Sequence, residues 1–250
     1  MTKKIITREE FEVERKEAAQ RMMSDKQIRL NATDVIEYST QYKQTHQMNW
    51  MGEPTLQLPQ DLFAMQEVIR KANPSVIVEL GVCWGGTTLF LSSVQTEQGG
   101  GQVIGVDIFM PRDLQKRIRE AEDEYCLSTI ELVESSSISP DVVGQIRDEL
   151  CRIDEGDSEE VLVILDTNHT EEQVSKELEI YSEFATYMVV CDTIVEDLPK
   201  PTNRPWGPGN SPRTALNKFL AENKNWERDV DICNKMLFSC QPDGYIRKIS

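Results

Sequence analysis

The sequence predicts a doubly wound α/β fold, in which helices cover both faces of a mostly parallel β-sheet. Between residues 75 and 193, short apolar runs alternate with amphipathic stretches of helical length. The runs are nearly continuous in apolar residues, which is typical of strands buried on both faces of a parallel sheet. A glycine-rich turn follows the first run, where doubly wound folds commonly bind their ligands. The 250 residues are enough for one such domain and a helical extension.

Residues 1–50 carry no strand pattern and are predicted to form a helical N-terminal extension. Apolar and charged residues repeat at helical spacing over 11–23, and residues 31–44 favour a second short helix. The apolar positions of the extension have no evident partner in the sheet pattern. We therefore expect it to pack against another subunit of a homo-oligomer or to close over the site.

Residues 51–250 are predicted to form the main domain. A helix over 60–71 follows two prolines and ends at Asn73 and Pro74. The next strands are expected at 75–80, 102–109, 129–135, 161–166 and 186–193, with helices at 87–95, 112–125, 140–150 and 170–184 between them. Strands and helices alternating at this spacing predict βαβ units with right-handed crossovers and a ligand crevice at the carboxyl ends of the strands.

The last part of the chain has a different pattern. A loop over 198–213, rich in Pro, Gly and Asn, precedes a helix over 214–223. Two final strands, over 235–240 and 245–249, flank the turn QPDG and are predicted to pair as an antiparallel hairpin. Five parallel strands followed by a hairpin make a Rossmann-like sheet of seven strands, which suits a methyltransferase better than a dehydrogenase.

Composition and charge exclude several classes of function. The net charge of −16 repels phosphate backbones, so we expect no nucleic-acid partner. No apolar run approaches the roughly 18 residues of a membrane span, and the charged N-terminus has no apolar core of a secretory signal. We expect a cytoplasmic protein without a membrane partner. The six cysteines contain no CxxC pair and are predicted to be reduced thiols.

The turn after the first strand, ELGVCWGGT, has the pattern GxxxGG. The pattern GxGxxG of dinucleotide folds is absent, so an NAD-dependent oxidoreductase is the weaker alternative. Glycines let the chain turn sharply and let a ligand approach the amides of a helix N-terminus, which can bind the methionine carboxylate of S-adenosylmethionine. An aspartate ends the second strand, where it can accept hydrogen bonds from ribose hydroxyls. The predicted cofactor-binding residues are Glu79, Gly81, Trp84, Gly85, Gly86, Thr87 and Asp107.

Acidic residues also end the fourth and fifth predicted strands. Asp166 and Asp192 are expected to face the same crevice, where two carboxylates can hold Mg²⁺ (or Mn²⁺). Such an ion binds an acceptor hydroxyl and lowers its pKa, and His169 can take the proton. We predict Asp166 and His169 as catalytic residues, and Asp166 and Asp192 as metal ligands. The alternatives are aspartates that cap the next helix and a histidine that only forms hydrogen bonds.

Five segments of the chain resemble a known family: NWMGEPTLQLPQDLFAMQEVI, IVELGVCWGGTTLFL, VILDTNHT, CDTIVEDLP and RPWGPGNSPRTALNKFL. They are similar to the cephalosporin hydroxylase-like family, which is built on the S-adenosylmethionine-dependent methyltransferase fold and includes rhamnosyl O-methyltransferases. The similarity runs in order over residues 45–249. It implies cofactor binding at Glu79, Gly81, Gly85, Gly86 and Asp107, and a divalent metal at Asp166 and Asp192.

The chain departs from this family at one position. Some members place an acidic residue immediately before the aspartate of the fifth strand, whereas this chain has Cys191. A neutral thiol is a poor ligand for Mg²⁺, and Glu196 or Asp197 in the following loop is an alternative ligand. Hydroxylase chemistry is not implied, because two distant histidines do not supply the two-His-one-carboxylate site of an iron oxygenase.

Together these features predict a metal-assisted O-methyltransferase that acts on a hydroxyl of a small molecule, such as a sugar or a secondary metabolite. Trp206 is expected to stack on a sugar or an aromatic ring, and Arg204 or Arg213 to bind a carboxylate or phosphate of the acceptor. The alternative for this loop is a rigid connector whose tryptophan only packs. The alternative function is a non-catalytic cofactor-binding partner protein of a biosynthetic enzyme.

Overall fold

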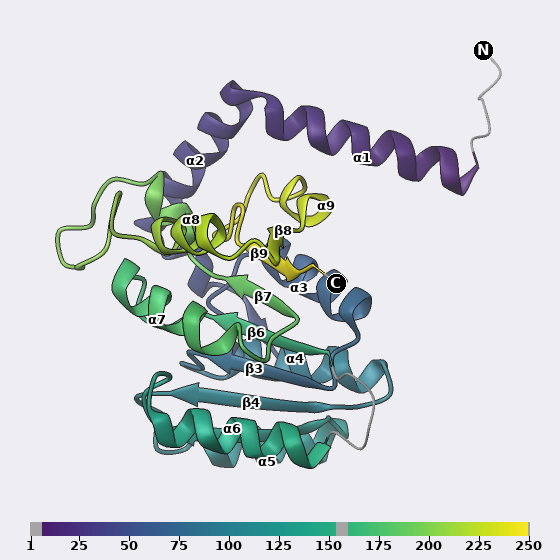
Figure 1. Ribbon diagram of the computed structural model, residues 1–250, viewed down its shortest axis with the longest axis vertical. Coiled ribbons are helices and arrows are strands. Elements are labelled where there is room, and N and C mark those ends of the chain that lie inside the picture. Colours follow the sequence, from purple (N-terminus) through teal and green to yellow (C-terminus); the bar gives the residue numbers. More distant parts are fainter. Residues whose placement is uncertain (1–6, 154–159, 250) are drawn as a thin grey trace.

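The computed structural model describes residues 7–153 and 160–249, and a sheet of seven strands lies at its centre (Figure 1). The order across the sheet is β5-β4-β3-β6-β7-β9-β8. Neighbours among β3 to β7 pair parallel, and β9 runs antiparallel to both of its neighbours. The predicted fold class is therefore confirmed. The strands are β3 (Val76–Leu80), β4 (Gln102–Asp107), β5 (Thr129–Glu134), β6 (Val161–Leu165), β7 (Tyr187–Val190), β8 (Trp226–Arg228) and β9 (Tyr245–Lys248).

Helices cover both faces of this sheet because successive strand residues point to opposite sides. In β3, Val76 and Val78 pack with α6, α7 and α8, whereas Ile77 packs on the other face with α3, α4 and α9. Helix α5 packs in a smaller cluster with α4. The bounds are α3 (Pro59–Ala72), α4 (Gly86–Glu97), α5 (Leu114–Tyr125), α6 (Pro140–Ile153), α7 (Glu171–Tyr181), α8 (Pro212–Glu222) and α9 (Val230–Cys233).

One predicted strand is wrong. Residues 235–240 form bends and turns, and β8 pairs with β9 in place of the predicted partner. The hydroxyl of Ser239 and the amide of Cys240 donate hydrogen bonds to Asp61 at the start of α3. These hydrogen bonds hold the segment against the start of α3, and it does not join the sheet. Met236 and Cys240 are buried in this loop, whereas Phe238 is 46% exposed.

Two helices, α1 (Arg8–Ser24) and α2 (Lys26–Thr40), precede the sheet, as the helical spacing predicts. Helix α1 projects away from the sheet, and none of its residues is buried (Figure 1). Ile36 of α2 packs against Ile194 and Cys240 of the main domain. The 3₁₀ helix η1 (Gln44–His46) and the paired strands β1 (Asn49–Trp50) and β2 (Glu53–Pro54) then lead to α3.

The division of the chain at residue 50 stays a prediction, and so does the homo-oligomer. Residues 1–6 of the predicted extension, and residues 154–159 and 250 of the predicted main domain, lie outside the described residues. Over 7–153 and 160–249, no helix has both the length and the apolar composition needed to cross a membrane.

The turn after β3 depends on a glycine. Gly81 has a φ of +99°, and a Cβ on it would lie 2.1 Å from the carbonyl oxygen of Asp166. Gly52 also has a positive φ, +89°, but has nothing within 4 Å of its Cβ position. We expect Gly81→Ala to lower the free energy of unfolding by at least about 1 kcal/mol more than Gly52→Ala, because only the former adds a clash to the backbone strain. Urea denaturation of both variants measures the difference, and equal losses would contradict the close approach.

Candidate active site

A cavity of about 680 Å³ lies at the carboxyl ends of β3, β4, β6 and β7. Strand order reverses here, since β4 and β6 flank β3 on opposite sides, and doubly wound folds bind their ligands at such points. The N-terminal extension contributes Thr45 and His46 to the wall, and the segment before α3 contributes Thr55. The sequence patterns did not single out these three residues, although Thr55 lies in a segment that resembles the family.

The turn between β3 and α4 forms one side of the cavity. Of the predicted cofactor residues, Gly81, Thr87 and Asp107 line it. Asp107 also holds the turn in place, because its Oδ2 accepts hydrogen bonds from the amides of Val82 and Cys83, both at 2.9 Å. The carboxylate that we expect to bind ribose therefore also fixes the backbone of the turn.

The other predicted cofactor residues lie outside the cavity lining. Glu79 is 2% exposed and accepts a hydrogen bond from the Thr88 hydroxyl at 2.5 Å. Burial raises the pKa of Glu79 to about 8, although the Thr88 hydrogen bond opposes this shift. Trp84 is 47% exposed. Glu79 thus supports the turn from behind.

Gly85 and Gly86 are surrounded by protein. A Cβ on Gly85 would lie 2.9 Å from side-chain carbons of Leu114 and Ile118 in α5. A Cβ on Gly86 would lie 2.3 Å from the carbonyl oxygen of Pro54 in β2. Close packing of α5 and β2 therefore already accounts for two of the glycines, and their role as cofactor contacts stays a prediction.

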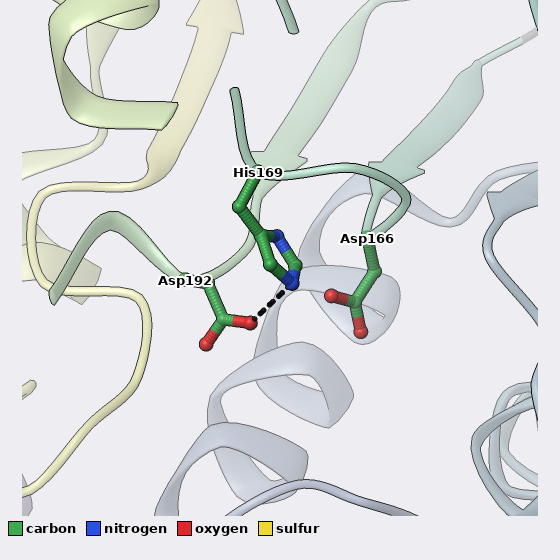
Figure 2. A group of neighbouring side chains, drawn as sticks. All are labelled: Asp166, His169 and Asp192. Carbon is green, nitrogen blue, oxygen red and sulfur yellow. Dashed lines mark ion pairs between the residues drawn. The ribbon is translucent and has the colours of Figure 1, made fainter. Parts of the chain in front are cut away.

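Figure 2 shows Asp166, His169 and Asp192 converging at the ends of β6 and β7. One potential ligand atom from each residue lies within 4.8 Å of those of the other two. His169 Nε2 is 3.0 Å from Asp192 Oδ2, and all three residues line the cavity. The strand ends thus bring together the three residues that the sequence singled out.

The charges of this cluster shift its pKa values. Burial and the neighbouring Asp192 raise the pKa of Asp166 to about 7, while the charge of His169 opposes that shift. Burial lowers the pKa of His169, but the charge and hydrogen bond of Asp192 and the charge of Asp166 outweigh it and raise the value to about 9. At neutral pH, without a metal, His169 is therefore a cation paired with Asp192.

Cys191 and the two alternative ligands in the following loop lie outside the group formed by Asp166, His169 and Asp192. Cys191 is 1% exposed and packs on the α3 and α4 side of the sheet, where burial raises the pKa of its thiol well above the usual value. Glu196, in the 3₁₀ helix η2 (Thr193–Glu196), accepts hydrogen bonds from the Ser211 and Thr214 hydroxyls. Asp197 pairs with Arg213 at 2.7 Å. These residues do not join the convergent cluster.

The loop before α8 forms the opposite side of the cavity. Trp206 lies edge-on to His169, with ring centroids 4.9 Å apart, and the Arg204 guanidinium lies 5.0 Å from the centre of the Trp206 ring. Both Arg204 and Trp206 line the cavity, whereas Arg213 is not among the lining residues and is neutralised by Asp197. The loop therefore places an aromatic ring and one cation beside the convergent cluster.

The strand order, with an antiparallel last strand and a cavity at the ends of its parallel strands, is that of the doubly wound fold that methyltransferases use. Comparison with known proteins supports this class. A family model described as Rhamnosyl O-methyltransferase/CmcI matches residues 42–249. The rhamnosyl O-methyltransferase of Mycobacterium leprae (strain TN) is 27% identical over 201 residues, covering 79% of this chain and 81% of the relative. That of Mycobacterium bovis (strain BCG / Pasteur 1173P2) is 25% identical over 202 residues, covering 79% and 76%.

Two solved structures have a similar fold. One, described as "CmcI-N160 apo-structure", has a TM-score of 0.56 and 15% identity, and the match covers 82% of this chain and 77% of that one. The other, "cmcI-D160 Mg-SAM", has a TM-score of 0.53 and 17% identity, covering 82% and 78%. The chain belongs to the Rhamnosyl O-methyltransferase/CmcI family and is an S-adenosylmethionine-dependent O-methyltransferase. The family resemblance of the sequence is confirmed.

The ion pair between His169 and Asp192 can be tested without a substrate. In metal-free protein, we expect Asp192→Asn to lower the pKa of His169 from about 9, because it removes the negative charge that stabilises the imidazolium. NMR titration of the imidazole protons measures the shift. Asp197→Asn is the matched control, since Asp197 pairs with Arg213 away from His169. An unchanged His169 pKa in Asp192→Asn would contradict the pairing.

Proposed function

We propose that this protein transfers a methyl group to a hydroxyl of a sugar-like small molecule, with the help of a divalent metal at Asp166 and Asp192. The convergence of Asp166, His169 and Asp192 in the same cavity as the turn after β3 carries this proposal. A group that activates the acceptor must lie near the cofactor, and the shared cavity of the cluster and the turn after β3 supports this role.

The side chains fit a hard cation. Carboxylate oxygens are the ligands that Mg²⁺ prefers, and two carboxylates converge here within 4.8 Å. Their mutual repulsion helps to raise the pKa of Asp166, and a bound cation removes that repulsion. We propose Asp166 and Asp192 as ligands of Mg²⁺ or Mn²⁺, which when bound lowers the pKa of an acceptor hydroxyl. The description of one solved structure with a similar fold, "cmcI-D160 Mg-SAM", also names magnesium.

His169 is proposed as the group that receives the acceptor proton. It can do so only in its neutral form, whereas Asp192 and Asp166 favour the imidazolium in metal-free protein. Asp166 and Asp192 would hold the divalent cation, whose charge would offset theirs and so favour the neutral form of His169. The proton passes from the hydroxyl to His169 Nε2 as the acceptor oxygen attacks the methyl carbon. S-adenosylmethionine supplies that methyl on a positively charged sulfur, and S-adenosylhomocysteine leaves.

The acceptor side of the cavity suits a polar ring. Trp206 offers an aromatic surface beside His169, and aromatic side chains commonly pack against the apolar face of a sugar. Arg204 can donate hydrogen bonds to hydroxyl or anionic groups of the acceptor. Relatives from two mycobacterial species are named rhamnosyl O-methyltransferases, which supports a sugar hydroxyl as the acceptor.

Cofactor binding at the turn after β3 can be measured directly. We expect Asp107→Ala to weaken S-adenosylmethionine binding about tenfold or more, because it removes the acceptor for ribose and two hydrogen bonds that hold the turn. Calorimetry measures the affinity, and Asp113→Ala, an exposed aspartate that pairs with Arg117, is the control. Binding of NAD⁺ but not of S-adenosylmethionine by the unmutated protein would overturn the assignment.

Metal dependence tests the proposed mechanism. We expect EDTA to abolish turnover with a sugar acceptor while S-adenosylmethionine affinity stays nearly unchanged, because the turn after β3 does not use the metal. Asp166→Asn should have the same effect, and added Mg²⁺ or Mn²⁺ should restore only the unmutated protein. His169→Ala should lower the rate by about 10²- to 10⁴-fold if it accepts the proton. Full activity in EDTA would exclude the metal role.

A further inference from the structure

Asp61 is a buried acid that the methyl-transfer mechanism does not use. It lies in the first turn of α3 and has no exposed surface. Ser239 Oγ donates a hydrogen bond to its Oδ1 at 2.5 Å, and the Cys240 amide donates one to its Oδ2 at 3.0 Å. Burial raises the pKa of Asp61 to about 7, although these two hydrogen bonds oppose the shift. Asp61 is thus a buried carboxyl group whose pKa lies close to neutral pH. It does not belong to the lining of the cavity.

Two buried amides connect Asp61 to Asp166. Gln57 Nε2 donates a hydrogen bond to Asp166 Oδ2 at 2.8 Å. Gln241 Nε2 donates one to Gln57 Oε1, also at 2.8 Å. The other end of the Gln241 amide lies 3.0 and 2.8 Å from the two oxygens of Asp61. Gln57 is 4% exposed and Gln241 is fully buried, so water cannot easily replace any member of this chain.

This chain of hydrogen bonds restricts the protonation of the two carboxyl groups at its ends. Each amide has one donor end and one acceptor end, so turning one requires the other to turn as well. If Gln57 donates to Asp166, then Gln241 presents its carbonyl to Asp61, and Asp61 must supply a proton. If both amides turn, Gln241 donates to Asp61, and Gln57 presents its carbonyl to Asp166. A buried pair of facing acceptors is costly, so one carboxyl of the two holds a proton.

The surroundings of Asp166 favour the first arrangement. Asp166 lines the cavity, where an ionised carboxylate can be solvated. Asp61 has no exposed surface, and burial in such a place favours the neutral acid. The proton therefore belongs at Asp61, and Gln57 Nε2 then holds Asp166 Oδ2 in a fixed direction.

We propose that Asp61, in its neutral form, is a positioning residue that acts through Gln241 and Gln57 to keep the Asp166 carboxyl group oriented for methyl transfer. This role rests on the proposed function of Asp166. Partners that orient a ligand carboxylate from behind typically change activity or metal affinity by about 10- to 100-fold when they are removed.

Asparagine is a close mimic of neutral Asp61. Its Nδ2 can occupy the position of Oδ1 and donate to the Gln241 carbonyl; the Ser239 hydroxyl, which donates to Oδ1 in the unmutated protein, then turns to accept from Nδ2. Its Oδ1 then occupies the position of Oδ2, where the Cys240 amide donates. We expect Asp61→Asn to keep kcat within about threefold of the unmutated protein, and Asp61→Ala to lower kcat about 10- to 100-fold with little change in KM for S-adenosylmethionine. Mg²⁺ binding to metal-free protein, measured by calorimetry, should weaken in Asp61→Ala and not in Asp61→Asn.

The control is Asp229→Asn. Asp229 is 2% exposed and binds Lys71 and Tyr187 away from the cavity, so this variant tests the loss of a buried aspartate as such. It should leave kcat and Mg²⁺ affinity unchanged. A loss of kcat in Asp61→Asn as large as in Asp61→Ala would overturn the proposal, because Asp61 would then act as an anion. An unchanged kcat in Asp61→Ala would overturn it as well.

Infrared difference spectroscopy locates the proton independently of activity. Near pH 7, where the two acids share one proton, metal-free protein should lose the carbonyl band of a neutral carboxylic acid in Asp61→Asn and keep that band in Asp166→Asn. Subtracting the spectrum of the unmutated protein removes the bands of other buried acids. The opposite result places the proton on Asp166 and overturns the proposal. If EDTA leaves turnover intact but the band disappears in Asp61→Asn, the metal role fails while the hydrogen-bond chain stands.

Discussion

The close approach of Gly81 to the backbone of Asp166 is the constraint on which the site depends. The Gly81 amide donates to the Val106 carbonyl of β4, and the Asp166 amide donates to the Leu80 carbonyl of β3, both at 2.8 Å. These bonds extend the parallel pairing of β4, β3 and β6 one step beyond the strands. Since there is no room for a Cβ on Gly81, the turn after β3 and the aspartate after β6 meet at a fixed distance. The predicted cofactor site and Asp166, one of the two proposed metal ligands, thus share one backbone junction.

Charge is the second organising feature of the site. Three carboxylates, those of Asp107, Asp166 and Asp192, line one cavity, in a chain whose net charge is −16. Like charges held together in a half-buried place disfavour their own ionised forms and favour cationic ligands. A methyl sulfonium and a divalent metal are both cations. The cavity is therefore electrostatically suited to the two ligands that an O-methyltransferase with metal assistance needs, and His169 compensates part of the charge in their absence.

Sequence patterns were sufficient for the features that depend on local periodicity. The apolar runs of β3, β4, β6 and β7 are bounded by the residues that lie at the cavity, so Asp107, Asp166 and Asp192 could be placed at one edge of the sheet. They were insufficient where packing between distant segments decides. The sequence pattern predicts that Gly85 and Gly86 bind the cofactor, but α5 and β2 fill the space beside these glycines. The sequence patterns assign no role to Thr45, Gln57 or Gln241, and only the tertiary structure brings them to the site.

The wrongly predicted strand over 235–240 and the buried Asp61 depend on the same hydrogen bonds. Residues 235–240 are apolar enough to form a strand, yet Ser239 and the Cys240 amide bind Asp61 at the start of α3. A segment that directs these groups at a helix N-terminus cannot also pair with β9. The chain then continues along the end of β7, where the Ile194 amide donates to the Cys240 carbonyl and the Val190 amide to the Gly244 carbonyl. This path brings Gln241 within hydrogen-bond distance of Gln57, which binds Asp166. Because 235–240 is held at α3 as a loop, β8 takes the place beside β9, and the loop supplies polar groups to the buried residues behind Asp166 where a hairpin strand would have placed alternating apolar side chains.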